Sequence, residues 1–359
     1  MGFNQSYQPV HRDKQSYFAF FNEFRDPYKI FATSLETLVL LILFVVSFVG
    51  NVSAIVVVAK DKKPVNKNFF VLNLFFADLL FVSTIPLIIS IRWTEAWALG
   101  SFACHMLFYV MSMSGCVTII TLATISLERM IAILKLQVAP VFNVKLVSSA
   151  LASIWIFSAS TSLPLCLFFN VMTIITDSKE VKICTLMWPS EIGEIVWDIA
   201  FTGLDFVIPG LIIVTSYTKI LQITKSSRRR LQSRRSIPNT ETQPCQVSRQ
   251  DFKLFRTLFL LMISFFVMWS PIFITVFLIL IRNFKNGLVI SSSLFFWVVT
   301  FTFANSALNP ILYSISHFRH QWRHKLCCFS LLAPCKSTDI AIPLQTIQNP
   351  QAQLSLISV

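Results

Sequence analysis

Residues 104–127 read CHMLFYVMSMSGCVTIITLATISL, a run without Asp, Glu, Lys or Arg that ends at Glu128 and Arg129. An apolar run of roughly 18 or more residues is long enough, as a helix, to cross a hydrocarbon layer about 30 Å thick. Lipid offers the backbone no hydrogen-bond partners, so such a run can cross only as a helix. Similar runs begin near Leu35, Phe69, Lys145, Ile195, Thr257 and Leu288. The sequence therefore predicts an all-α membrane protein, a seven-transmembrane helix bundle.

The amino-acid composition is also that of a protein embedded in lipid. Of the 359 residues, 55% are hydrophobic, 13% are charged and 35 are phenylalanine. An ordinary globular chain has roughly 45–50% apolar and 25% charged residues. One protein core cannot absorb this excess of apolar surface while so few charges cover the outside. Disordered and collagen-like chains are excluded by the same figures.

The net charge of +13 indicates how the bundle is oriented in the membrane. If the N-terminus is extracellular, nine of the thirty lysines and arginines lie outside and the rest lie inside. Cytoplasmic loops of membrane proteins accumulate these residues, so we expect an extracellular N-terminus, no nucleic-acid partner, and attraction to anionic membrane lipids. The expected domains are an extracellular tail (1–31), the seven-transmembrane domain (32–316), and a short amphipathic cytoplasmic helix with a cytoplasmic tail (317–359).

Several modification sites follow from this orientation. Asn4 begins an Asn4-Gln5-Ser6 acceptor for glycosylation in the outer tail. Cys104 and Cys184 both face the oxidising side, where they can form a disulfide. Cys327 and Cys328 follow the amphipathic helix at the inner surface, where acylation is plausible chemistry.

Polar side chains inside the spans are expensive to bury and are functional candidates for that reason. A hydrated cluster of them in the first, second, third and seventh spans could hold a small cation such as sodium, or could only join the helices by hydrogen bonds. No other cofactor is expected. The cluster consists of Asn51, Asp78, Thr118, Asn305, Ser306 and Asn309.

A set of short motifs, each weak alone, is specific in combination. They are Glu128-Arg129-Met130 in the third span, Trp155 in the fourth, Pro209 and Tyr217 in the fifth, Met268-Trp269-Ser270-Pro271 in the sixth, and Asn309-Pro310-Ile311-Leu312-Tyr313 in the seventh. The prolines interrupt helix hydrogen bonding and allow hinges. From Asn51 onward the chain resembles the rhodopsin-like (class A) G-protein-coupled receptors.

Longer strings narrow the resemblance to the long-chain and omega-3 fatty-acid receptors of this class. They are Arg92-Trp93-Thr94-Glu95-Ala96-Trp97, Leu107-Phe108-Tyr109-Val110-Met111, Ile183-Cys184-Thr185-Leu186, Ile220-Leu221-Gln222-Ile223-Thr224-Lys225 and Phe301-Thr302-Phe303-Ala304-Asn305-Ser306. The resemblance implies a receptor and not an enzyme, located in the plasma membrane with an endosomal pool. The implied partners are a G protein, mainly of the Gq/11 type with Gi as an alternative, together with arrestin and receptor kinases.

The resemblance also implies an activation switch and a ligand pocket. The switch consists of Glu128, Arg129, Tyr217, Trp269, Pro271, Asn309, Pro310 and Tyr313. Helical spacing places Phe108, Met111 and Ser112 on one face of the third span, and Trp197, Phe201 and Asp205 on one face of the fifth. The remaining pocket residues are Trp269, Phe273, Phe295, Phe296, Trp188 of the outer loop, and Phe20 and Phe21 of the tail.

Arg92 is the expected partner of a fatty acid's carboxylate, because arginine binds a carboxylate through two parallel hydrogen bonds. Pairing with Glu95 or contact with lipid headgroups is the alternative. Asp205 replaces an asparagine of the relatives and would repel a headgroup at its depth. Met268 replaces their cysteine, and the arginine that precedes Phe20 in them is absent.

Other functions remain open from the sequence. Within the receptor class, the ligand could be another lipid or a peptide. A transporter or channel is the alternative from a different class, although such proteins favour an internal repeat or charges in line through the bilayer.

Overall fold

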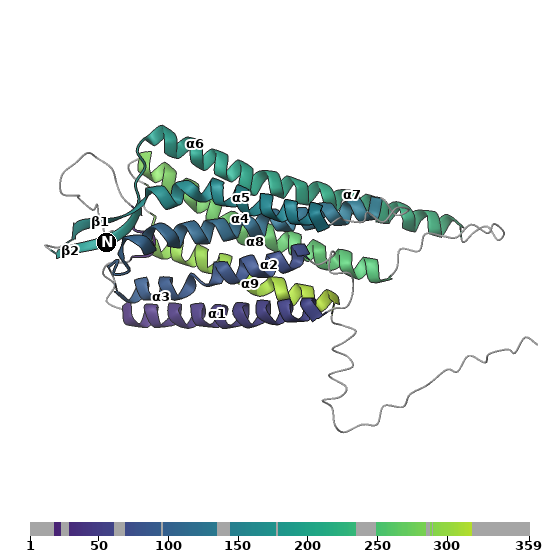
Figure 1. Cartoon of the computed structure of the whole chain (residues 1–359), viewed down its shortest axis with the longest axis horizontal. Coiled ribbons are helices and arrows are strands. Elements are labelled where there is room, and N and C mark those ends of the chain that lie inside the picture. The colour runs from purple at the N-terminus through teal and green to yellow at the C-terminus, as the bar shows by residue number, and fades with distance from the viewer. Residues whose placement is uncertain are drawn as a thin grey trace, which may run out of the picture. The chain divides into compact units, whose positions relative to one another are not determined.

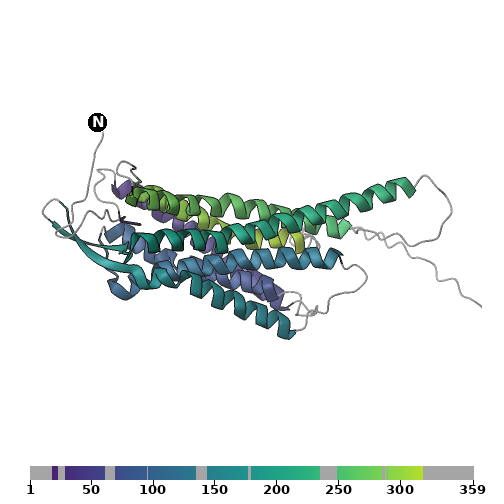
Figure 2. The same ribbon diagram turned by 90° about the horizontal axis from the view of Figure 1, so that it is seen from above.

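The structure is a computed structural model that describes residues 18–22, 29–60, 69–94, 96–134, 144–176, 179–234, 249–284, 288 and 290–317. Within these residues, seven helical stretches are long and apolar enough to cross a membrane. They run along a common axis, with a β-hairpin at one end (Figures 1 and 2). We call this the hairpin end of the bundle. The predicted all-α seven-transmembrane fold is confirmed.

The elements follow one another in the order expected from the apolar runs. In chain order they are α1 (Lys29–Lys60), α2 (Phe69–Val82), α3 (Ile85–Thr94), α4 (Gly100–Leu134), α5 (Val144–Phe168), β1 (Phe169–Thr176), β2 (Lys179–Leu186), α6 (Glu191–Thr202), the π-helical turn η2 (Gly203–Val207), α7 (Ile208–Arg234), α8 (Arg249–Phe284) and α9 (Ser292–His317).

The helix α4 packs against α2, α5 and α7, while α1 packs against α2 and α9, and α8 packs against α9. A polar tie joins three of these helices near the middle of the bundle. Trp155 Nε1 on α5 donates to Asn73 Oδ1 on α2 at 2.8 Å, and Asn73 Nδ2 donates to Thr121 Oγ1 on α4 at 2.9 Å. This tie satisfies polar groups that would otherwise be buried without partners.

Two spans are interrupted. Between α2 and α3, the hydroxyls of Ser83 and Thr84 donate to the backbone carbonyls of Leu80 and Phe81, each at 2.7 Å. In the fifth span, η2 widens the helix directly before Pro209. Proline has no N–H for the carbonyl four residues earlier, so the helical ladder must change there.

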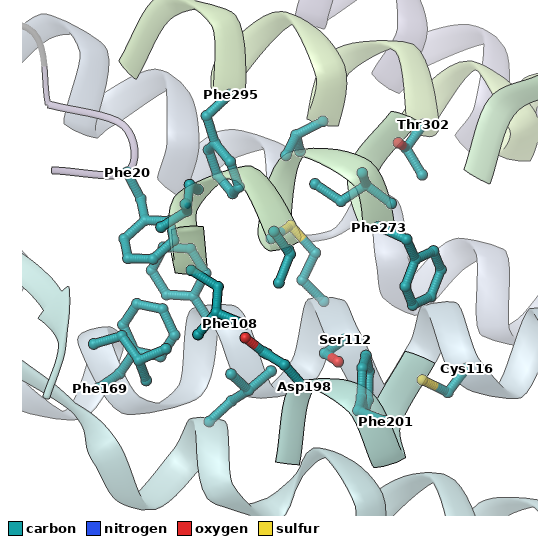
Figure 3. Close-up of a pocket in the computed structure, with 18 of the residues that line it drawn as sticks. Phe20, Phe108, Ser112, Cys116, Phe169, Asp198, Phe201, Phe273, Phe295 and Thr302 are labelled. Carbon is teal, nitrogen blue, oxygen red and sulfur yellow. The ribbon is translucent and has the colours of Figure 1, made fainter. Parts of the chain in front are cut away.

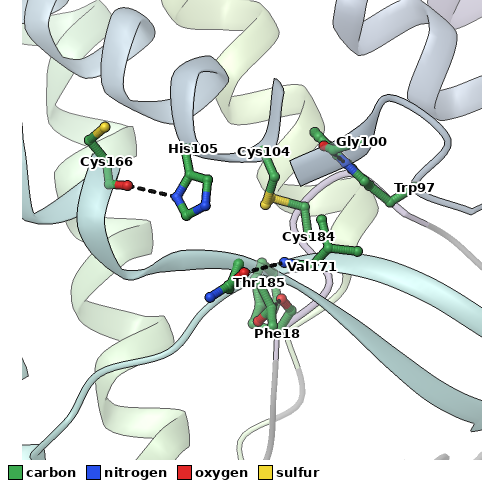
Figure 4. The surroundings of a disulfide bond; sticks show 10 residues. Phe18, Trp97, Gly100, Cys104, His105, Cys166, Val171, Cys184 and Thr185 are labelled. Atoms are coloured by element: carbon green, nitrogen blue, oxygen red, sulfur yellow. Dashed lines mark hydrogen bonds between the residues drawn. A yellow bond between two sulfur atoms is a disulfide. The ribbon is translucent and has the colours of Figure 1, made fainter. Parts of the chain in front are cut away.

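The hairpin of β1 and β2 is antiparallel, with Phe169 opposite Leu186 and Thr176 opposite Lys179. It is tied to the start of α4 by a disulfide between Cys104 and Cys184, whose Cα atoms lie 5.7 Å apart (Figure 4). The predicted disulfide is therefore present.

Some predictions fall outside the described residues. These are glycosylation of Asn4, acylation of Cys327 and Cys328, and the amphipathic surface helix that was expected to begin at residue 317. They stay predictions, as do the domain limits 1–31, 32–316 and 317–359.

Candidate functional site

A cavity of about 150 Å³ lies inside the bundle toward the hairpin end, enclosed mostly by apolar side chains (Figure 3). Most of its lining residues come from α4, α6, α8 and α9. Sequence-predicted pocket residues that line it are Phe20, Phe108, Met111, Ser112, Trp197, Phe201, Trp269, Phe273 and Phe295.

Aromatic rings form a continuous surface along this cavity. The rings of Trp197 and Phe201 are stacked with centroids 4.8 Å apart, and Phe201 lies 6.1 Å from Phe273. The indole N–H of Trp197 donates to the carbonyl of Thr161 at 3.0 Å. That bond uses the ring's polar atom on the helix behind it, which leaves its apolar face for the cavity.

A short N-terminal segment, residues 18–22, closes the hairpin end. Its phenylalanines 18, 20 and 21 are buried, and Phe20 packs 5.1 Å from Phe108 and 5.0 Å from Phe169, between ring centroids. The backbone of the segment is held by side chains of the bundle. Thr185 Oγ1 donates to the carbonyl of Phe18 at 3.0 Å, and the Ser292 hydroxyl donates to the carbonyl of Ala19.

Four other predicted pocket residues lie behind the lining. Phe21 is stacked on Phe108, and Trp188 packs on Trp197 with centroids 5.4 Å apart. Asp205 is fully buried in η2; its Oδ1 accepts from Thr161 Oγ1 at 3.3 Å and its Oδ2 has no hydrogen bond. Phe296 lies beside the guanidinium of a buried arginine. These four residues lie outside the cavity lining, and their predicted contact with the ligand stays a prediction.

That arginine is Arg92, which also does not line the cavity. Its Nε and Nη2 each donate to a carboxylate oxygen of Glu36 on α1 at 2.8 Å, and its Nη1 donates to the carbonyl of Phe21 at 3.0 Å. Both side chains are about 5% exposed. The expected alternative partner, Glu95, lies outside the described residues. Arg92 therefore joins α1, α3 and the N-terminal segment in the structure.

The sequence reasoning missed several lining residues. Phe169 and Leu186 come from the hairpin, which hydropathy did not predict, and Glu194 and Asp198 are acids on the inward face of α6. The two acids could have been identified from the sequence, because a charged residue at or within an apolar run is a functional candidate. The other missed lining residues are Phe81, Cys116, Ile119, Leu165, Ile272, Val276, Ile279, Leu280, Val299 and Thr302.

The polar cluster around Asp78 lies deeper in the bundle. Asp78 Oδ1 accepts from Ser306 Oγ at 3.1 Å and from Thr118 Oγ1 at 3.4 Å, and Oδ2 accepts from Asn309 Nδ2 at 2.7 Å. Buried amide oxygens of Asn305 and Asn309 have no hydrogen-bond partner. A carboxylate with unpaired amide oxygens is the type of ligand set that suits a small, hard cation.

The predicted switch residues divide between two regions. Trp269 lies at the inner wall of the cavity, 5.7 Å from Phe81 between ring centroids. At the opposite end of the bundle, Tyr217 lies beside Arg129. Pro271 and Pro310 lie inside α8 and α9, where each removes one backbone hydrogen bond. Glu128 is half-buried, and the Tyr313 side chain lies outside the described residues.

Comparisons with known proteins agree with this arrangement. Residues 50–313 match the family model of the seven-transmembrane receptors of the rhodopsin family. The chain is 54% identical over 318 residues to free fatty acid receptor 4 of Mus musculus, covering 88% of each protein. The Rattus norvegicus receptor of the same name gives the same identity and coverage.

A more distant relative is somatostatin receptor type 5 of Rattus norvegicus, which is 29% identical over 296 residues, covering 80% of this chain and 76% of that receptor. The family model spans most of the described bundle, from within α1 to the last turns of α9. This chain therefore belongs to the rhodopsin family of seven-transmembrane receptors and is a multi-pass plasma-membrane receptor rather than an enzyme.

Proposed function

We propose that this receptor is activated by medium- to long-chain free fatty acids, including omega-3 polyunsaturated acids. The observation that supports this proposal most directly is the cavity inside the bundle, whose lining is apolar and aromatic over most of its surface. The names of its mouse and rat relatives support the same ligand class. Each methylene removed from water contributes about 0.8 kcal/mol, so a long acyl chain can supply most of the binding free energy.

The aromatic wall offers a reason for selecting unsaturated chains. Ring faces and edges make favourable contacts with π electrons at preferred geometries. Trp197, Phe201 and Phe273 form such a wall on α6 and α8. A polyunsaturated chain lying along them would gain contacts that a saturated chain of equal length lacks.

Activation requires that the ligand bind two receptor states unequally. A chain that fills the cavity against Trp269 would favour movement of α8 at Pro271, and the region of Arg129 and Tyr217 would then open to a G protein. We propose coupling mainly to the Gq/11 type, with Gi as an alternative, followed by phosphorylation by receptor kinases and arrestin binding. A G protein that binds near Arg129 and Tyr217 places this end of the bundle in the cytoplasm and the N-terminus outside the cell. Internalisation of the arrestin-bound receptor would give the endosomal pool.

We also propose that the cluster around Asp78 binds sodium as an allosteric ion. Asp78 would provide the negative charge, and the oxygens of Thr118, Ser306 and the buried asparagines would complete the ligand set. A bound cation there would favour whichever receptor state keeps α2, α4 and α9 closest together.

The test of the fatty-acid function is calcium release in cells that express the full chain. A panel of saturated and polyunsaturated acids of equal length would be compared with their methyl esters and with untransfected cells. We expect responses to the acids and a large loss with the esters. A response to other lipids or to peptides, without one to any acid, would contradict the proposal.

A further inference from the structure

The charged side chains among the described lining residues are both acids. Glu194 and Asp198 lie four residues apart and therefore on one face of α6, and both line the cavity. The proposed ligand is itself an acid. Its carboxyl group therefore meets carboxyl groups in this cavity, and among the described lining residues there is no lysine or arginine to neutralise them.

The carboxyl group of Asp198 is free to form hydrogen bonds with a ligand. Its side chain is 5% exposed, and its carboxyl forms no hydrogen bond or ion pair with any residue that the structure describes. Figure 3 shows its carboxyl end directed into the ring of lining side chains, among Phe108, Ser112 and Phe201. Glu194 differs, because its Oε1 already accepts from Asn283 Nδ2 on α8 at 3.1 Å.

Charged and titratable groups on the surrounding elements do not pair with Asp198. Of these groups, only Glu194 and Cys116 share the cavity lining with Asp198. The guanidinium carbon of Arg282 lies 5.5 Å from the ring centroid of Phe18, and His105 Nδ1 lies 2.7 Å from the carbonyl oxygen of Cys166. At this end of the bundle the described groups are Glu36, Arg92, His105, Tyr109, Cys116, Cys166, Lys179, Glu180, Lys182, Glu191, Glu194, Asp205 and Arg282.

Given the fatty-acid function proposed above, we propose that Asp198 and the ligand's carboxyl group share one proton. Two carboxylates in one desolvated site cannot both be ionised at low cost, so one of them takes up a proton. The shared proton forms a short, charge-assisted O–H···O⁻ hydrogen bond, and the pair keeps a single negative charge. The proton comes from the solvent or from an Asp198 that is already protonated in the empty receptor. The acid is thus recognised without a salt bridge.

This recognition links ligand affinity to pH. Where both carboxyls are ionised before binding, each unit of pH increase should weaken binding by up to about tenfold, because one proton is taken up per ligand. In the variant Asp198→Asn, the amide N–H₂ donates to the ligand's carboxylate without titrating. Its affinity for the acid should therefore be independent of pH over the same range.

The experiment compares concentration-response curves of the full-length receptor and Asp198→Asn for one long-chain acid between about pH 6 and pH 8.5, where a free carboxyl group stays ionised. The ratio of the two half-maximal concentrations removes effects of pH on lipid partitioning and on the assay. We expect this ratio to change by up to about tenfold per pH unit in the alkaline part of the range. The matched control is Glu191→Gln, an exposed acid of α6 outside the cavity lining, which should keep the pH dependence of the unmodified receptor.

A second arm uses only the unmodified receptor, so the test survives if Asp198→Asn does not reach the cell surface. An alkyl sulfonate of the same chain length holds no proton at these pH values. A sulfonate can only accept a hydrogen bond from a protonated Asp198 and cannot share the proton, so we expect it to be weaker than the carboxylate throughout this pH range.

The two proposals fail in different ways. Equal potency of sulfonate and carboxylate, with no pH dependence for the carboxylate, would overturn proton sharing and leave the fatty-acid function intact. An identical pH dependence in Asp198→Asn would also overturn it. If no carboxylate activates the receptor at any pH, the fatty-acid function itself is wrong.

Discussion

Gly115 allows the ring of Trp269 to lie against the backbone of α4. A Cβ atom added at position 115 would lie 2.8 Å from Cη2 and 2.9 Å from Cζ3 of Trp269. Trp269 packs against Phe81 and also lines the cavity, so a ring pushed away from α4 would move into the cavity. The smallest side chain is therefore required at this position for the indole to keep its place.

We expect Gly115→Ala to displace Trp269 toward the cavity and to lower the potency of long-chain acids by about tenfold or more, since overpacking a core costs about 1–3 kcal/mol. Concentration-response curves corrected for surface expression would measure this. The matched control is Gly203→Ala, because no atom lies within 4 Å of a Cβ added there. Equal potency in the two variants would show that the contact with Trp269 does not limit ligand binding.

The buried ion pair of Arg92 and Glu36 should contribute to the stability of the receptor. Removing one partner of a buried pair leaves an uncompensated charge and costs about 3–5 kcal/mol. Arg92→Gln should therefore lower the thermal stability of the purified receptor, and Glu36→Gln should do the same. The double variant should be less destabilised than the sum of the two single variants.

The same variants separate two roles for Arg92. If Arg92 only holds the N-terminal segment, both single variants should lower acid potency together. If Arg92 binds the ligand's carboxylate, Glu36→Gln should release it and raise potency. The sequence could identify Arg92 as a lone cation in an apolar region, but not its partner. Glu36 lies 56 residues away and has no periodic relation to Arg92.

At the scale of elements, hydropathy locates the apolar part of each helix and little else. The helix α1 begins at Lys29 and α8 at Arg249, before the apolar runs near Leu35 and Thr257. Helical hydrogen bonds can continue into water, where polar residues are well solvated, so the helix extends past its apolar part. In α9 the start is later than the run near Leu288, because Ser291 Oγ accepts from the Leu294 N–H at 3.1 Å as a cap.

The hairpin was not predicted, although it contributes Phe169 and Leu186 to the cavity. Its strands are short, and their stability depends on contacts that no local pattern reports. It joins the disulfide to the N-terminal segment, because Cys184 precedes Thr185 directly and Thr185 binds the carbonyl of Phe18.

We therefore expect Cys104→Ser or Cys184→Ser to destabilise the receptor by about 2–5 kcal/mol, as is typical when a native disulfide is removed. Acid potency should fall as well, since β2 would no longer hold the N-terminal segment in place. Thermal unfolding and concentration-response curves would measure the two effects. Cys166→Ser is the control, because Cys166 is a free thiol. A Cys184→Ser receptor that matches this control would contradict the role given to the hairpin.

At the scale of the whole molecule, composition predicted the membrane class and the apolar runs predicted the number of spans. They could not predict a cavity, because its shape depends on how helices distant in sequence pack. The cluster around Asp78 is an intermediate case. The sequence indicated its members, and the structure places Ser306 and Asn309 of α9 within hydrogen-bonding distance of Asp78 on α2.

The proposed sodium site predicts a coupling across the whole bundle. Replacing sodium chloride by choline chloride should change acid affinity several-fold in membranes, because coupling free energies between sites are typically about 1–3 kcal/mol. Asp78→Asn removes the charge and keeps the side-chain shape, so the salt replacement should then have no effect. A salt effect of equal size in Asp78→Asn would assign it to general screening.

The buried N-terminal segment determines how this receptor can be shortened or fused to another protein. A truncation that removes residues 1–17 keeps the four buried side chains of residues 18–22 in place. A truncation that begins after residue 22 removes three phenylalanine rings from the interior and leaves Arg92 without one of its acceptors. Fusion partners for purification or imaging therefore belong before residue 18, and a protease site placed after Asn22 would release part of the receptor's own core.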